Sequence, residues 1–410
     1  MSIRVGIDKA RVYPCSLSLD MADLCAARGH DPADIRDVMM IDERSVNPPF
    51  EDPVTMAVNA ARPMLTEADR RNIELLIVAS ESGVDQEKPM STWVQRYLDL
   101  GPWCRNFEVK HACYGGTAAL RMASAYLASG FTHPSAKALV ICTDQSRMHL
   151  GKPYEYVMGA GATALLVSRD PGLFSLEPGA SGVFTHEVSD LTRPTSRVET
   201  GNSETSLLSY LDALDNAFRA YLENAGGRIG YDHFHKNIYH APFGGMTLRA
   251  TRTALRVLGE CTKERARATW EKKTLASLAH VRRMGGTYAG STFIGLLGLV
   301  EGSPDLSPGD RIGIFSYGSG CCSEFYSGLL GPEAKRVAEE ARLKFLLDQR
   351  YRLSVDEYEA IERERTDCID SGDFVTTKDL CDGLYERRYQ GRGLLVFQGI
   401  HDHYRQYAWS

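Results

Sequence analysis

The chain has 410 residues, of which 43% are hydrophobic and 24% are charged, and its formal net charge is −6. This length suffices for two or three domain-sized units or for one large duplicated fold, and the small net charge favours neither a nucleic-acid partner nor an anionic membrane. No stretch holds the ~20 apolar residues that span a bilayer, and the N-terminal MSIRVGID has no apolar signal segment, so we expect a cytoplasmic protein.

In the first 170 residues, apolar strand-like runs alternate with helical patterns. The patterns predict strands at 5–7, 73–79, 106–110, 138–143 and 162–168, and helices at 19–27, 53–65, 91–100 and 116–129. A second pass follows, with strands at 235–240 and 311–316 and a helix at 292–299. Such alternation predicts an α/β layered fold with buried, largely parallel strands, and the two passes indicate an internal duplication.

These passes divide the chain into four parts. We expect one half of the fold at 1–170, a connecting region at 171–234, the second half at 235–330 and a helical appendage at 331–410. Within the connecting region, residues 192–205 are poor in apolar residues and rich in turn formers. This composition predicts a surface loop or a site entrance, with disorder as the alternative.

Cys113 lies between a strand-like run and a helical pattern, in the sequence FEVKHACYGGTAAL. A thiol at the N-terminus of a helix faces unpaired backbone N–H groups, which favour the thiolate. Gly115 and Gly116 follow, and we expect them to let backbone or substrate approach the sulfur closely. This context makes Cys113 the candidate nucleophile, and the alternative is a small buried apolar residue.

Two further candidates end strand-like runs. Glu81 follows the run 73–80, where burial would raise the pKa of its carboxyl towards that of a useful base, although capping a helix is also possible. His240 ends the second-half run and precedes a Pro- and Gly-containing turn. His233, His235 and His240 fit no standard metal spacing, nor does any pair of the ten cysteines, so we predict reduced thiols and no metal.

The segment from Arg249 to Arg283 carries ten cations and three anions, so it is +7 while the remainder of the chain is −13. A basic face of this kind favours an acidic partner, and the alternative is an ordinary solvated helix surface. Trp270 is its single aromatic residue, which makes single-stranded nucleic acid a poor candidate.

Taken together and in order, the motifs resemble the 3-hydroxy-3-methylglutaryl-CoA (HMG-CoA) synthases of the thiolase superfamily. The matching segments cover most of residues 3–330: GID at 6–8, ASESGVD at 79–85, FEVKHACY at 107–114, GAGA at 159–162, HAPF at 240–243, FSYGSG at 315–320 and EFYS at 324–327. The resemblance implies a duplicated βαβαβαββ fold in α-β-α-β-α layers.

The resemblance also implies roles for individual residues. Cys113 resembles the acylated nucleophile, Glu81 the acid/base and His240 the residue that orients the second substrate. The backbone at Cys113 and Ser316 resembles an oxyanion hole, and the substrate-positioning residues are expected to be Ser316, Tyr317, Gly318 and Gly286. Gly286 departs from the family pattern because an Asn is expected there, which leaves open how the second carbonyl is held.

The motifs around His240 and Ser316, together with the Tyr-rich C-terminus, look most like the synthases of polyketide β-branching. That resemblance implies donor and acceptor acyl carrier proteins, substrates carried on phosphopantetheine or CoA, no further cofactor and a homodimer. Because carrier proteins are typically acidic, we expect them to contact the basic segment, at Arg265, Arg267, Lys272 and Lys273. The alternatives are a primary HMG-CoA synthase using acetyl-CoA and acetoacetyl-CoA, a ketosynthase III-like condensing enzyme, and a non-catalytic scaffold that binds carriers.

Overall fold

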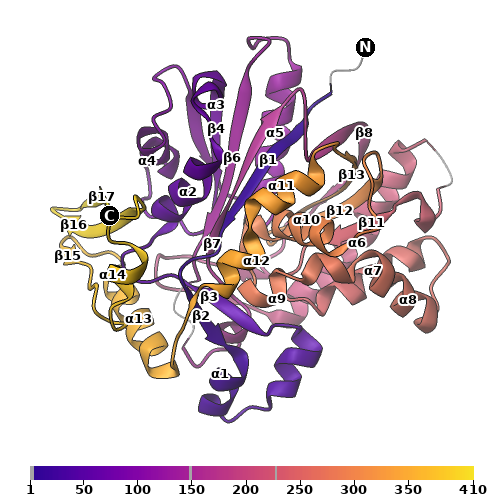
Figure 1. Cartoon of the computed structure of the whole chain (residues 1–410). Helices are drawn as coiled ribbons and strands as arrows, with labels where there is room; N and C mark the ends of the chain where they lie inside the picture. The colour runs from indigo at the N-terminus through magenta and orange to yellow at the C-terminus, as the bar shows by residue number, and fades with distance from the viewer. Residues whose placement is uncertain (1–3, 147–149, 227–228) are drawn as a thin grey trace.

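The computed structural model describes residues 4–146, 150–226 and 229–410. Its centre is a nine-stranded mixed sheet (Figure 1). From one edge to the other, the strands are β11 (Lys236–Tyr239), β12 (Arg311–Gly318), β13 (Cys322–Leu330), β8 (Phe174–Thr185), β1 (Gly6–Tyr13), β7 (Gly161–Ser168), β6 (Lys137–Asp144), β4 (Ile73–Ala79) and β5 (Arg105–Val109).

This sheet consists of two half-sheets that meet where β1 pairs with β8, at Gly6–Ser175 and Ile7–Phe174. Both halves repeat one pattern: a parallel pair, β4–β6 or β11–β12, is followed by two antiparallel pairs. The repeat confirms the predicted duplicated thiolase-like fold. The expectation of largely parallel strands is wrong, because the sheet is mixed. Strands buried on both faces are equally apolar in either direction, so the sequence pattern does not reveal direction.

Helices cover both half-sheets and fill the space between them. On the outer face of the first half lie α2 and α4, on that of the second α6 and α7, and between the halves α5 and α10. This arrangement is the expected α-β-α-β-α layering. The helices are α2 (Pro53–Ala61), α4 (Met90–Tyr97), α5 (Gly115–Ala128), α6 (Ser203–Asn224), α7 (Met246–Val257) and α10 (Ser291–Gly302).

The region 171–234, expected to connect the halves, contributes the central strand β8 and the 22-residue helix α6. Apolar side chains on one face of α6 pack against β8 and β13, in a core that includes Phe218 and Phe325. In the segment 192–205, a loop at 193–199 joins two short strands, β9 (Leu191–Thr192) and β10 (Thr200–Gly201), and α6 begins at Ser203. The segment is therefore structured, and the alternative of a disordered segment is wrong.

Two predicted helices have different bounds in the structure. The predicted helix at 19–27 is a strand followed by a helix, because the side chain of Asp20 accepts hydrogen bonds from Ala22 and Asp23 N–H and starts the helix only there. The predicted helix at 53–65 ends at Ala61, and a 3₁₀ turn containing Pro63 follows. Proline lacks the N–H that an α-helix interior requires.

The appendage is a mixed α/β structure rather than the helical one expected (Figure 1). A three-stranded sheet from its far end packs on α2, and its short first strand joins a second small sheet with the N-terminal part of the chain. The remaining elements are α1 (Met21–Arg28), β2 (Leu17–Asp20), β3 (Glu43–Val46), α3 (Glu67–Asn72), α8 (Lys263–Lys273), α9 (Val281–Met284), α11 (Ala334–Ala341), α12 (Leu343–Asp348), β14 (Tyr351–Arg352), α13 (Val355–Asp367), β15 (Phe374–Val375), α14 (Leu384–Arg388), β16 (Leu395–His401) and β17 (Tyr404–Trp409).

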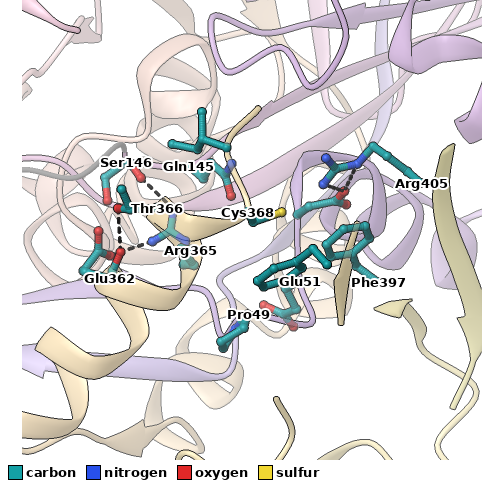
Figure 2. Close-up of a pocket in the computed structure, with 13 residues that line it drawn as sticks. Pro49, Glu51, Gln145, Ser146, Glu362, Arg365, Thr366, Cys368, Phe397 and Arg405 are labelled. Carbon is teal, nitrogen blue, oxygen red and sulfur yellow. Dashed lines mark hydrogen bonds and ion pairs between the residues drawn. The ribbon is translucent and has the colours of Figure 1, made fainter. Parts of the chain in front are cut away.

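A polar junction fastens this appendage to the first half (Figure 2). Arg405 donates to the buried carboxylate of Asp52, the residue that caps α2, and Arg365 donates to the carbonyl of Ser146. Charge-assisted hydrogen bonds between buried groups are strong, so the appendage is an integral part of the fold. The pocket in Figure 2 is lined by residues of this junction and contains none of the predicted catalytic residues.

Among the described residues, no helix combines the length and the apolar character that a membrane span requires.

Candidate functional site

Cys113 lies in the turn between β5 and α5, one residue after Ala112, whose backbone is left-handed with φ of 41°. A residue with a side chain rarely adopts this conformation, so the turn is tightly constrained. The thiol sulfur is 3.8 Å from Oε2 of Glu81, and Cys113 lines a cavity. The structure therefore joins the predicted nucleophile and the predicted acid/base directly.

The expected thiolate of Cys113 is not what the surroundings favour. Burial raises the pKa of the thiol well above its usual value, and the negative charges of Glu81 and Asp144 raise it further. Two N–H groups at the helix start, those of Tyr114 and Gly115, are already used by carbonyls within the turn. These surroundings favour the protonated thiol of Cys113, and the carboxylate of Glu81 lies within reach of its proton.

Gly116 was expected to let backbone or substrate approach the sulfur of Cys113, but in the structure it serves helix packing. A Cβ at this position would lie 2.5 Å from the carbonyl oxygen of Ala289 and 2.6 Å from the sulfur of Cys142. A glycine is required here so that α5 can pack against the turn before α10. At Gly115 a Cβ would meet only ordinary contacts, the nearest at 3.6 Å.

Glu81 follows β4 at its carboxyl end, next to the end of β5 that leads to Cys113. The two strands are parallel, with Ala79 opposite Val109, and the N–H of Ser80 donates to the carbonyl of Val109 at 3.1 Å. Parallel strands thus deliver carboxylate and thiol to the same edge of the sheet, as predicted.

Burial raises the pKa of Glu81, and repulsion from Asp144 raises it further. Asp144 is a buried carboxylate at the end of β6 that accepts hydrogen bonds from the N–H of Glu81 and from the hydroxyls of Ser80 and Ser82. Two buried carboxylates this close disfavour ionisation of both. Glu81 therefore binds a proton more readily than an ordinary glutamate, which suits a general base.

Sequence reasoning missed three residues around this carboxylate. Asp144 ends an otherwise apolar strand, so its polarity at a strand end was the available signal. Arg193 and Glu199 come from the loop between β9 and β10, and Arg193 contacts both the backbone of Glu81 and the carboxylate of Glu199. Nothing in the composition of that loop identifies them, because the contact joins residues 112 positions apart.

His240 enters the site from the second half of the fold. Its N–H donates to the carbonyl of Phe315, its carbonyl accepts from the hydroxyl of Tyr210, and its Nδ1 lies 2.8 Å from the hydroxyl of Ser291. Burial lowers the pKa of the imidazole to about 3, so His240 is neutral at physiological pH. A neutral, fixed imidazole can orient and polarise a carbonyl without carrying a charge.

Cys113 and His240 line one cavity of about 340 Å³. Its walls are mainly apolar, and Arg249 of the basic segment also lines it. Glu81 lines a second cavity of about 230 Å³ on the other side, and Glu199 borders both. The apolar walls of the first cavity are Met39, Val157, Met158, Leu191, Leu207, Pro242, Phe243 and Met246.

The four predicted positioning residues lie close to this site but differ in their contacts. Tyr317 lines the cavity, yet its hydroxyl donates to Asp190 and Ser209. Ser316 is buried in β12, and its role in an oxyanion hole stays a prediction. A Cβ on Gly318 would lie 2.6 Å from the carbonyl of His111 and the N–H of Tyr114, so Gly318 packs against the nucleophile turn.

Gly286 also lines the cavity, where the family pattern has Asn. Its N–H donates to the carbonyl of Val157, its carbonyl accepts from Gly159 N–H, and a Cβ would lie 2.8 Å from the carbonyl oxygen of Pro242. An asparagine would require this backbone to shift. The hydroxyl of the neighbouring Tyr288 is buried without a hydrogen-bond partner in the described structure.

The predicted carrier-binding residues have different exposures. Arg265 and Arg267 are exposed and pair with Glu260 and Glu271. Lys272 is exposed. Lys273 is buried, and its amine donates to the carbonyls of Tyr231 and Phe234 and to Asp232, so its side chain faces inward. A surface role for Lys273 does not fit this placement.

In the three described ranges, no three His, Cys, Asp or Glu side chains are grouped as metal ligands.

The packing of Gly318 gives a test of how the nucleophile is held. We expect Gly318→Ala to displace the turn around Cys113 and to slow alkylation of its thiol by iodoacetamide at least about tenfold, because no space exists for the added methyl group. Gly101→Ala is the matched control, since a Cβ there has no atom within 4 Å. Alkylation is followed by mass spectrometry of the Cys113 peptide, and equal rates in both variants would contradict the assignment.

Comparisons with known proteins identify relatives of this chain. Residues 251–408 match the family model described as "Hydroxymethylglutaryl-coenzyme A synthase C terminal". The polyketide biosynthesis 3-hydroxy-3-methylglutaryl-ACP synthase PksG of Bacillus subtilis (strain 168) is 39% identical over 372 residues, which cover 88% of each chain. A hydroxymethylglutaryl-CoA synthase of Enterococcus faecalis is 33% identical over 365 residues, covering 88% of this chain and 92% of that one.

Among solved structures, the HMG synthase of the curacin biosynthetic pathway matches with a TM-score of 0.94 at 39% identity, covering 99% of this chain and 100% of that one. The same enzyme in complex with acetyl donor-ACP matches with a TM-score of 0.93 at 38% identity and the same coverage. Extensive identity over most of both chains, together with the Cys113–Glu81–His240 geometry, shows that this chain belongs to the hydroxymethylglutaryl-CoA synthase family.

Proposed function

We propose that this protein is an HMG synthase of polyketide β-branching. It transfers an acetyl group from a donor acyl carrier protein to Cys113, adds that group to the β-ketone of a chain on an acceptor carrier protein, and releases a 3-hydroxy-3-carboxymethyl acyl product by hydrolysis. The observation that carries the proposal is the distance of 3.8 Å between the sulfur of Cys113 and the carboxylate of Glu81, beside a cavity that also contains His240.

The first step is acyl transfer. The sulfur of Cys113 attacks the acetyl thioester while Glu81, whose pKa is raised by burial, accepts the thiol proton. Collapse of the tetrahedral intermediate breaks the bond to the carrier's pantetheine sulfur, which takes the proton from Glu81 and leaves as a thiol. The carboxylate is thereby restored for the next step. Backbone N–H groups at Cys113 and Ser316 are the proposed donors to the oxyanion.

The second step forms the carbon–carbon bond. Glu81 removes a proton from the acetyl methyl group, and the resulting enolate attacks the β-ketone of the acceptor. The hydroxyl of Ser291 lies 2.8 Å from Nδ1 of His240. In the proposed mechanism Ser291 donates to this nitrogen, so that the proton of the neutral imidazole is on Nε2 and serves the ketone oxygen. Glu81 returns its proton to the new alkoxide, and water then cleaves the thioester at Cys113.

Two relatives support carrier proteins as substrates. The name of PksG, a 3-hydroxy-3-methylglutaryl-ACP synthase, places the product on a carrier protein, and the curacin enzyme has been solved in complex with acetyl donor-ACP. The second candidate is a primary synthase that uses acetyl-CoA and acetoacetyl-CoA, and the Enterococcus faecalis relative favours it at lower identity. Substrates on phosphopantetheine serve either function without a further cofactor.

The catalytic roles predict different failures for two variants. Cys113→Ser removes the nucleophilic sulfur, so incubation with acetyl-carrier should leave no acetyl thioester on the protein. Glu81→Gln keeps the sulfur and removes the base, so the acetyl adduct should still form, more slowly, while condensation falls by at least about 10²-fold. Intact-protein mass spectrometry and product analysis measure the two steps.

The same assay separates the two functions. Wild-type protein should acetylate faster with acetyl-carrier than with acetyl-CoA at equal concentration. A preference for acetyl-CoA would favour the primary synthase, and normal condensation by Glu81→Gln would remove Glu81 from the base role.

A carrier protein is proposed to contact the exposed part of the basic segment, at Arg265, Arg267 and Lys272 on α8. Arg249 of the same segment lines the cavity that leads to Cys113, so the segment extends from the surface to the site. An acidic carrier would be attracted by this charge.

Charge reversal tests this contact. The double variant Arg265→Glu, Arg267→Glu should weaken carrier binding about tenfold at low salt, and the difference should shrink as salt screens the charges. Lys335→Glu on α11, an exposed cation of another surface, is the control. Isothermal titration with the donor carrier gives Kd, and an unchanged Kd in the double variant would place the carrier elsewhere.

A homodimer is also part of the proposal, through the edge strand β5. This strand ends the central sheet, so one side of its backbone has no neighbouring strand in the described chain. Trp103, two residues before β5, is 88% exposed, and Phe131, just after the helix α5 that packs beside this strand, is 93% exposed. Exposed apolar groups beside an open sheet edge are typical of a protein interface.

Light scattering during size-exclusion chromatography tests the dimer. Wild-type protein should elute with twice the chain mass of 45.4 kDa. Trp103→Glu, Phe131→Glu should shift the population towards monomer, because burial of a new charge is unfavourable. Val375→Glu, at an exposed position in another sheet, should leave the mass unchanged, and a wild-type monomer would refute the interface.

A further inference from the structure

Arg193 connects the loop between β9 and β10 to the catalytic carboxylate. Its Nη1 donates to the backbone carbonyl of Glu81, and its Nη2 lies 3.9 Å from Oε1 of the same residue. Its Nε donates to Glu199 at 3.0 Å, and Nη2 also contacts that carboxylate. The side chains of Arg193, Glu81 and Glu199 are 15%, 12% and 7% exposed.

Charged or titratable groups face Glu81 from each neighbouring element. Asp144 comes from the end of β6, Cys113 from the turn before α5, and Tyr288 from the turn before α10. The loop supplies Arg193 and Glu199. Asp144 and Glu199 oppose a negative charge on Glu81, whereas Arg193 favours it, so the loop contains one group acting in each direction.

The guanidinium fork explains why this loop residue is suited to the task. Two edges of a planar guanidinium can be used at once, and Arg193 uses them for a carbonyl and a carboxylate. The contact to the carbonyl fixes the backbone of Glu81, and the contact to Glu199 fixes the guanidinium. Glu199 borders the cavity of Cys113 as well as that of Glu81, so this pair connects the loop to both cavities.

We propose that Arg193 and Glu199 are positioning residues for the catalytic base: Arg193 holds Glu81 at Cys113 and favours its carboxylate, and Glu199 limits that effect by sharing the guanidinium. The inference rests on the proposed function, in which Glu81 removes the methyl proton. It gives the loop formed by residues 193–199, which was predicted as a surface loop or a site entrance, a role in the chemistry of the site.

The proposal predicts opposite effects for two substitutions. Arg193→Met removes the cation, so the Glu81 carboxylate forms at higher pH, and the acid limb of the condensation rate should move up by about one pH unit. Glu199→Gln removes a like charge and frees the guanidinium, so that limb should move down. A purely structural role would lower the rate in both variants without moving the limbs apart.

The measurement is the single-turnover condensation rate of protein already acetylated on Cys113, between about pH 5 and pH 9. Below the midpoint, a shift of one pH unit reduces the ionised fraction about tenfold, so Arg193→Met should be about tenfold slower there. Arg193→Lys retains the charge without the fork and should fall between Arg193→Met and wild type in the position of the limb.

Arg197→Met is the matched control from the same loop. Arg197 is 51% exposed and pairs with Asp370 on the surface, away from Glu81, so its profile should match wild type. Melting temperatures establish that each variant is folded. If Arg193→Met does not fold, the downward shift in Glu199→Gln decides the question alone.

Two results would overturn the inference: acid limbs of Arg193→Met and Glu199→Gln that coincide with wild type, or limbs that move in the same direction. Failure of wild-type protein to acetylate or condense would instead overturn the proposed function. The wild-type reaction, which is measured first, therefore separates the two.

Discussion

The site depends on a buried carboxylate held 3.8 Å from a thiol. The charged form of each group is disfavoured there: burial raises the pKa of both, the charge of Asp144 raises that of Glu81 further, and the charges of Glu81 and Asp144 raise that of Cys113 further. The thiol proton is therefore retained by the Cys113–Glu81 pair until a bound substrate reacts with the sulfur. A thiolate formed in advance would be more reactive towards any electrophile, whereas a thiol beside a basic carboxylate reacts when the proton can be transferred.

Fixed hydrogen-bond donors around Asp144 and the nearby cation Arg193 offset the unfavourable electrostatics of this arrangement. Asp144 accepts three hydrogen bonds from the loop that carries Glu81, so a second buried carboxylate also fixes the position of the first. Arg193 contributes positive charge without entering the cavity of Cys113, since it lines only the cavity of Glu81 among the two. The compensating cation is thus outside the lining of the cavity that contains Cys113 and His240.

Much of the fold and of the site could be predicted from the sequence. The features that could not be predicted each have a physical reason. Cys113, Glu81 and His240 each follow an apolar run, and strand ends of a layered fold converge at one edge. Strand direction was inaccessible because β7 and β13 are buried along most of their length, as parallel strands are. The charge state of Cys113 was misjudged because its helix N–H groups are used within the turn. Arg193 was missed because its partner Glu81 is distant in sequence, and Lys273 was misjudged because its partners include backbone carbonyls, which no sequence pattern reveals.

The duplication explains why two unlike halves make one site. By sheet position β4 corresponds to β11, and by its place before the next strand α5 corresponds to α10. Glu81 follows β4 and contacts Cys113 just before α5, while His240 follows β11 and contacts Ser291 at the start of α10. The same strand-end to helix-start contact therefore occurs twice. In the first half it joins the proposed base to the proposed nucleophile, and in the second it joins a neutral imidazole to a hydroxyl, so in the proposed mechanism one inherited geometry serves proton transfer in one half and carbonyl orientation in the other.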